Sequence, residues 1–209
     1  MTLLTFFSFI VYSTVTSITP GPNNIMLAAS GLNFGLKRSV PHILVIGFGF
    51  GVMVILVGYG IGAVLGSSPL LYEVLKIVGI SYLLYLAYKI YRAGSIKTDT
   101  QVDKPLSFIG AALFQWVNPK AWIMAMGAIA TYSSVDSNLA ELIFIGAVFG
   151  LVSIPSVGIW AYMGERLKSL VNDQQKVQIF NRCMALLLVI SVIKPIIDST
   201  QFFFLYSNF

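Results

Sequence analysis

Charged residues are scarce in this chain. Asp, Glu, Lys and Arg make up only 10% of its 209 residues, whereas 57% are apolar, and the mean hydropathy is +0.85. A soluble domain carries about 25% charged residues. The chain therefore has too few polar groups to cover its surface in water, which excludes an ordinary soluble protein and indicates that lipid surrounds most of it.

Cysteine and histidine are nearly absent too, each occurring once, as Cys183 and His42. One cysteine excludes an intrachain disulfide, and one histidine with one cysteine cannot build a metal site. No phosphate-binding loop or other soluble-enzyme signature occurs, so we expect neither an enzyme nor a cofactor. The net charge of +5 does not indicate a nucleic-acid partner, because the basic residues are confined to particular loops, as orientation in a lipid bilayer requires.

Long stretches carry no charge at all, among them residues 1–36, 39–72 and 142–164. A membrane-spanning helix needs roughly 20 mainly apolar residues, whereas strands of a membrane barrel are shorter and alternate strictly. These stretches do not alternate, so the sequence predicts an all-α membrane protein whose single domain covers residues 1–209. Its six transmembrane helices are expected near residues 3–31, 39–65, 70–92, 106–133, 139–163 and 180–200.

The positions of the basic residues predict an orientation. Lys and Arg occur in the loops after the first, third and fifth predicted spans, and none occurs at residues 66–69 or 134–138. Basic loops face the cytoplasm. We therefore expect a multi-pass protein of the bacterial inner membrane with both termini in the periplasm.

A polar segment at residues 94–105 divides the chain into two halves, about 1–93 and 106–209. Each half holds three predicted spans, so the second half must enter the membrane in the opposite orientation, as in an inverted-topology repeat. The first span of each half contains proline, and the second span of each is rich in glycine. Pairs such as Gly47 and Gly51, or Gly146 and Gly150, are spaced for close helix packing.

The first span contains Pro20, Gly21 and Pro22, followed by Asn23 and Asn24. Two prolines and a glycine cannot continue a regular helix, so backbone carbonyls are freed at membrane depth. Lipid cannot satisfy these carbonyls, and we expect the break to face a polar cavity or other protein. The asparagines add amide groups, and either one can cap the following half-helix, whose positive N-terminus suits a carboxylate. The alternative is a structural kink.

The fourth span contains a counterpart, Asn118, Pro119 and Lys120. A lysine midway along a span is costly in lipid, so Lys120 is expected to face the interior or a cavity. There it can bind the carboxylate of a substrate. The alternatives are that it donates to carbonyls freed near Pro119, or that it extends to the membrane surface.

His42 is the histidine candidate for a proton carrier, because imidazole titrates near neutral pH. It lies just inside the cytoplasmic end of the second predicted span, where a polar side chain is also ordinary. Glu73 and Lys76 have the spacing of an ion pair near the outer end of the third span. No acidic residue is expected deep in any span, so the sequence does not identify a carboxylate that carries protons.

The two proline motifs resemble those of the lysine exporter (LysE/RhtB) superfamily of bacterial amino-acid exporters. Chain length, helix number and motif positions are similar over essentially the whole chain. The resemblance implies export of an amino acid or derivative, driven by the proton gradient, from a homodimer. The residues that carry it are Thr19–Asn23, Gly31, Gly35 and Phe114–Lys120, and the segments Thr19–Ile25 and Ala185–Val189 resemble the cysteine and O-acetylserine exporter branch.

We therefore predict a secondary transporter with a small zwitterionic substrate. The alternatives left open are a passive channel and an integral membrane protein that transports nothing. The predicted substrate-binding residues are Pro20, Gly21, Pro22, Asn23, Asn24, Asn118, Pro119 and Lys120.

Overall fold

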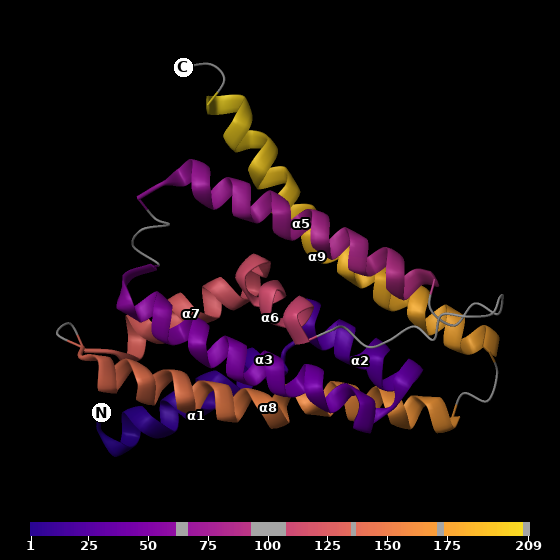
Figure 1. The fold of residues 1–209 in the computed structure, drawn as a ribbon, viewed down its shortest axis with the longest axis horizontal. Helices are drawn as coiled ribbons and strands as arrows, with labels where there is room; N and C mark the ends of the chain where they lie inside the picture. The colour runs from indigo at the N-terminus through magenta and orange to yellow at the C-terminus, as the bar shows by residue number, and fades with distance from the viewer. Residues whose placement is uncertain (62–66, 93–107, 135–136, 171–173, 207–209) are drawn as a thin grey trace.

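The computed structural model describes residues 1–61, 67–92, 108–134, 137–170 and 174–206, and these form helices without strands (Figure 1). Among the described residues a helix occurs at each predicted position, with α2 and α8 ending later than expected and α9 extending six residues beyond each of its expected ends. The predicted linker at 94–105 lies outside the described residues. The helices are α1 (Leu3–Ile18), α2 (Pro22–Phe34), α3 (Leu36–Leu56), the π-helical turn η1 (Val57–Ile61), α5 (Pro69–Arg92), α6 (Phe108–Val117), α7 (Pro119–Tyr132), α8 (Leu139–Leu170) and α9 (Gln174–Tyr206).

Three helices among the described residues are long and apolar enough to cross a membrane by themselves: Leu36–Gly60, Leu139–Leu167 and Gln175–Gln201. The pair α1 and α2, bent by 59° at its break, adds a fourth if it counts as one span. The α6 and α7 helices have 10 and 14 residues, about 15 and 21 Å long, so neither crosses the roughly 30 Å hydrocarbon layer alone. The chain is an integral membrane protein, and the six-span repeat stays a prediction.

The helices lie roughly along one long axis of the molecule (Figure 1). The start of α3, the end of α5, the end of α8 and the start of α9 gather at one end of that axis, and the N-terminus lies at the other. The last turn of α5 contains Lys89 and Arg92, and Lys37 and Arg38 stand in the first turn of α3. The basic helix ends therefore share one end of the molecule, as the charge pattern predicts.

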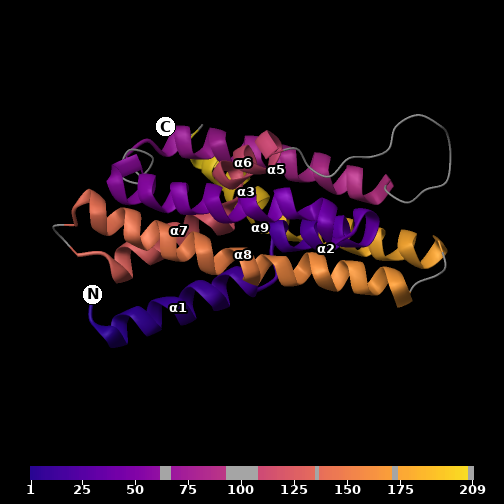
Figure 2. The ribbon, with the colours of Figure 1, turned by 60° about the horizontal axis from the view of Figure 1, so that its bottom comes forward.

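Helix α8 forms the centre of the packing. It packs against α1, α2 and α3, while α5 and α9 lie side by side and pack against α6 and α2. Figure 2 shows α1 and α8 on one side, α5 and α6 on the opposite side, and α3 between them. Large apolar side chains such as Leu4, Val11, Phe48, Leu151 and Leu186 remain exposed on the outer faces. Apolar exposure on this scale is expected of a surface that contacts lipid.

The predicted glycine pairs are at the crossing of α3 and α8. A Cβ added to Gly51 would lie 2.8 Å from the Gly146 carbonyl oxygen, and one added to Gly146 would lie 2.6 Å from that of Gly51. Gly47 and Gly150 approach each other in the same reciprocal way, at 3.0 and 2.8 Å. The two backbones therefore touch, which brings the second predicted span of each half into direct contact.

Candidate functional site

The break between α1 and α2 begins where two prolines remove backbone donors. Pro20 has no N–H for the carbonyl of Thr16, and Pro22 has none for that of Ile18. The hydroxyl of Thr19 donates to Thr16 O at 2.9 Å, and the indole Nε1 of Trp160 donates to Ile18 O at 2.9 Å. The α1–α2 break is thus a real interruption of the helix whose freed carbonyls find side-chain donors, as buried carbonyls require.

The side chain of Asn24 donates hydrogen bonds to two more carbonyls of the α1–α2 break. Its Nδ2 donates to Ser17 O and to Thr19 O, each at 2.8 Å, and its side chain is buried. The expectation that an asparagine caps α2 is wrong, because the cap residue is Gly21 and no side chain bonds there. Asn24 instead turns back toward α1, since the carbonyls opened by the prolines lie within its reach.

Lys120 reaches the same break from α7. Its Nζ donates to Thr19 O at 2.6 Å, to Thr19 Oγ1 at 3.0 Å and to Pro20 O at 3.4 Å. A Cβ added to Gly21 would lie 2.7 Å from Lys120 Cδ, so the lysine in this position requires glycine there or a shift of its side chain. Lys120 therefore donates to carbonyls at the α1–α2 break, those of Thr19 and Pro20, and not to those near Pro119.

The break between α6 and α7 is satisfied locally. Asn118 caps α7, its Oδ1 accepting from the backbone N–H of Lys120 at 3.1 Å. Pro119 occupies the first helical position, where a missing N–H costs nothing. The N–H of Asn118 bonds to Gln115 O at 3.4 Å, and the indole of Trp122 donates to Trp116 O at 2.7 Å. The second proline motif thus ends one helix and starts another without calling on distant residues.

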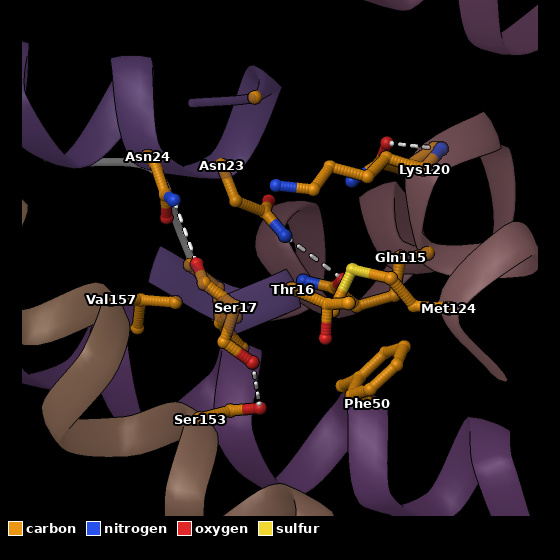
Figure 3. Close-up of a pocket in the computed structure, with 14 residues that line it drawn as sticks. Thr16, Ser17, Asn23, Asn24, Phe50, Gln115, Lys120, Met124, Ser153 and Val157 are labelled. Carbon is orange, nitrogen blue, oxygen red and sulfur yellow. Dashed lines mark hydrogen bonds between the residues drawn. The ribbon is translucent and has the colours of Figure 1, made fainter. Parts of the chain in front are cut away.

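Both breaks line one cavity between α1, α2, α3, α6, α7 and α8, with an empty volume of about 360 Å³ that includes its open mouth (Figure 3). Five predicted residues line this central cavity: Gly21, Asn23, Asn24, Asn118 and Lys120. Two segments about 100 residues apart in sequence therefore meet at one place.

The other four predicted residues do not line the central cavity. Pro22 is buried as the first residue of α2, Pro119 starts α7, and Pro20 contributes only its carbonyl, to Lys120. His42 is 2% exposed on α3, and neither ring nitrogen has a hydrogen-bond partner in the described structure.

Polar atoms at the central cavity have unused bonding capacity. Asn23 Nδ2 donates to Gln115 Oε1 at 3.1 Å, which leaves Asn23 Oδ1 and Gln115 Nε2 buried and without partners. Asn24 Oδ1 is buried and unpaired as well. Figure 3 shows the side chains of Asn23, Gln115 and Lys120 converging. Buried polar atoms are rarely left unpaired, so this cluster of acceptors and donors fits a site for a polar ligand.

Sequence reasoning missed several polar lining residues, namely Thr16, Ser17, Gln115 and Ser153. The hydroxyls of Ser17 and Ser153 are 3.0 Å apart and join α1 to α8 inside the membrane protein. The sequence contains a signal for the lining residues of α1, because hydroxyl residues recur at helical spacing along this otherwise apolar helix. Gln115 lies three residues before Asn118 and one turn away on the same motif.

The charges of the central cavity are unbalanced. None of its described lining residues is Asp, Glu, His or Arg, so Lys120 is its charged member.

The predicted pair of Glu73 and Lys76 is confirmed, with Oε1 and Nζ 2.6 Å apart. Glu73 is only 5% exposed, and it lies in the first two turns of α5, near the end of the helix where the sequence places the pair. No group of residues able to hold a metal ion occurs in the described ranges.

Comparison with known proteins adds a family to this geometry. A family model described as LysE type translocator matches residues 14–197. The chain is 28% identical over 196 residues to the cysteine/O-acetylserine efflux protein of Shigella flexneri serotype 5b, covering 93% of this chain and 98% of that protein. It is 24% identical over 195 residues to the homoserine/homoserine lactone efflux protein of Salmonella typhimurium, covering 91% and 95%. No solved structure matches.

Proposed function

Because this chain belongs to the LysE family of translocators, we propose that it exports a small amino acid or amino-acid derivative from the bacterial cytoplasm by proton antiport. The named activities of two similar proteins, efflux of cysteine or O-acetylserine and of homoserine or its lactone, support this substrate class. The observation that carries the proposal is the central cavity, where two helix breaks from opposite halves of the chain meet.

The unused polar atoms of the central cavity suit the two charged groups of a zwitterion. An ammonium group needs oxygen acceptors, and Asn23 Oδ1 and Asn24 Oδ1 are unpaired beside the carbonyls of the α1–α2 break. A carboxylate needs donors, and it meets Gln115 Nε2, the positive N-terminus of α2 or Lys120. The substrate therefore lies between the two broken helices, near the middle of the membrane.

Alternating access follows from the proposed six-span inverted repeat. The cavity lies between the halves, so rocking one half against the other opens it first to the cytoplasm and then to the periplasm. The basic helix ends would face the cytoplasm and both termini the periplasm. A homodimer in the inner membrane completes the proposal.

A flux assay tests this function. Purified protein in proteoliposomes is given labelled O-acetylserine, cysteine and homoserine, with and without a pH gradient. Saturable transport that the gradient drives is expected. Linear flux without coupling indicates a channel, and no flux of any of these solutes indicates a protein that does not transport them.

The Lys120→Ala variant tests the site. Its net export is expected to fall by at least about tenfold, because a hydrogen bond to a charged group is worth about 1.5–3 kcal/mol and 1.4 kcal/mol is tenfold in rate. Lys37→Ala removes an exposed lysine from α3 and is the matched control, with export expected to stay unchanged. Normal export by Lys120→Ala, with normal membrane insertion, would exclude the central cavity as the substrate site.

A further inference from the structure

The ammonium of Lys120 has no bonding capacity left for a substrate. A lysine Nζ carries three N–H donors. All three have oxygen acceptors here, Thr19 O, Thr19 Oγ1 and Pro20 O, at 2.6, 3.0 and 3.4 Å. A substrate carboxylate approaching Lys120 would have to break these bonds first. The seat formed by these three oxygens therefore binds a cation, and the lysine fills it.

The oxygens of the seat belong to the α1–α2 break, and the lysine that occupies it comes from α7. Its carbonyls belong to residues whose helix the two prolines interrupt, and Gly21 gives the lysine its passage. An ammonium group of an amino acid has the same charge and the same three donors as the lysine. Two ammonium groups cannot share one set of oxygens, so the lysine and the substrate compete wherever the substrate reaches this break.

Lys120 is the group at this site that can carry a proton. No titratable residue occurs on α2 or α6. The other described titratable groups of the helices around α7 are bonded elsewhere or do not line the cavity. Tyr12 donates to Met124 O, Tyr132 bonds to Ser8, Glu165 accepts from Leu36 N–H, and Glu141 accepts from Ser134. The remaining ones do not line it: Lys37, Arg38, His42, Tyr59, Tyr162 and Arg166.

We propose that Lys120 is the proton carrier of the exporter, and that its ammonium and the ammonium of the substrate exclude each other from the seat on Thr19 and Pro20. This inference rests on the proposed function and assigns its coupling to Lys120 in place of His42. The substrate carboxylate then binds Gln115 Nε2 and the N-terminus of α2, where Gly21 offers no capping side chain.

The exchange balances in protons. On the cytoplasmic side Lys120 gives one proton from Nζ to water, leaves the carbonyls as a neutral amine, and the substrate ammonium takes its place. On the periplasmic side water returns one proton to Nζ, the new ammonium takes the seat, and the substrate leaves. Because the periplasm is the more acidic side in respiring cells, this cycle runs toward export.

Proton release on binding tests the competition directly. Homoserine is added to the detergent-solubilised protein in weakly buffered solution, and the proton change is measured with an indicator dye. The wild type is expected to release about one proton per bound homoserine, and its affinity to rise about tenfold per pH unit while Lys120 is protonated. The Lys120→Met variant should release none and bind with an affinity that does not change with pH. His42→Gln should behave as the wild type.

Four results would overturn the proposal. The first three are binding of homoserine to the wild type without proton release, proton release by Lys120→Met, and loss of the release in His42→Gln. A fourth is a loss of affinity of more than about tenfold in Lys120→Met at alkaline pH, since that identifies Lys120 as a ligand of the carboxylate.

Tryptophan fluorescence gives a readout that needs no substrate. Trp122 follows Lys120 by two residues and packs edge-on against Trp116, and Trp160 donates to Ile18 O at the same break. A pH titration of this fluorescence should show a one-proton step in the wild type that Lys120→Met lacks. If homoserine fails to bind, the proposed function fails for that solute. The fluorescence titration still decides the role of Lys120. The absence of a step in the wild type, or the same step in Lys120→Met, would overturn Lys120 as the proton carrier.

Discussion

The two helix breaks have similar sequences but are stabilised in different ways. At the α6–α7 break, Asn118 caps the following helix and Trp122 covers a carbonyl of the preceding one, so all donors come from within a few residues. At the α1–α2 break, Trp160 and Lys120 donate from residues 142 and 101 positions away. The α1–α2 break therefore depends on distant residues as well as on its own Thr19 and Asn24, whereas the α6–α7 break depends on nearby residues alone.

This difference indicates which break can change state. A local cap persists as long as its own helix persists. Carbonyls held by distant side chains lose their donors whenever the helices that carry these side chains move, or when a donor loses its charge. The α1–α2 break is therefore the place where motion, protonation and ligand binding are coupled, and the α6–α7 break serves as a rigid mount for Lys120.

Replacing one asparagine at each break should show the largest difference in stability between the two breaks. Asn24→Ala leaves Ser17 O and Thr19 O without Asn24 as donor and is expected to lower the free energy of unfolding by about 2 kcal/mol or more. Asn118→Ala loses one cap, worth about 1 kcal/mol. Unfolding in detergent, followed by circular dichroism, measures both. Equal losses would contradict the contrast between the breaks.

Crowding the lysine seat should impair transport with little effect on stability. Gly21→Ala places a Cβ 2.7 Å from Lys120 Cδ and forces the side chain from its acceptors. One lost hydrogen bond, about 1 kcal/mol, corresponds to about a fivefold lower export rate. Gly49→Ala on α3 is the matched control, because its Cβ would be an ordinary 3.6 Å from Gln115 Cγ. Unchanged export in Gly21→Ala would show that the seat plays no part in transport.

The smallest expected effect is the energetic coupling between two side-chain donors at the same break. Trp160→Phe loses the bond to Ile18 O, next to the carbonyls that Asn24 covers, so combining it with Asn24→Ala should give a non-additive energy of about 0.5 kcal/mol or more. Trp122→Phe acts on the other break and should add to Asn24→Ala within about 0.5 kcal/mol. Additivity in both double mutants would mean that the donors at the α1–α2 break act independently.

Much of the fold could be predicted from the sequence because its signals are local. Charge-free stretches located the helices, Pro20, Pro22 and Pro119 located the breaks, and the glycine spacing anticipated the backbone contact of α3 and α8. The number of membrane spans could not be predicted as directly, because α6 and α7 are each too short to cross the membrane alone and depend on neighbouring helices to do so.

The site was predicted in part. Gly21, Asn23, Asn24, Asn118 and Lys120 line one cavity, as the pairing of motifs suggested, but Gln115, Ser17 and Ser153 were missed. Single polar residues in apolar helices look alike in sequence whether they face a cavity, a neighbouring helix or lipid. Only the rotation of each helix about its axis separates these cases, and packing fixes that rotation.

The sequence by itself determined that this protein lies in lipid, that it is helical, and that two of its helices are interrupted, because charge content and proline chemistry act within a few residues. Only the tertiary structure decided which donors satisfy the carbonyls of the α1–α2 break. Asn24, Trp160 and Lys120 were all able to donate elsewhere, and the choice among acceptors depends on where the close contacts of α2, α3 and α8 place them.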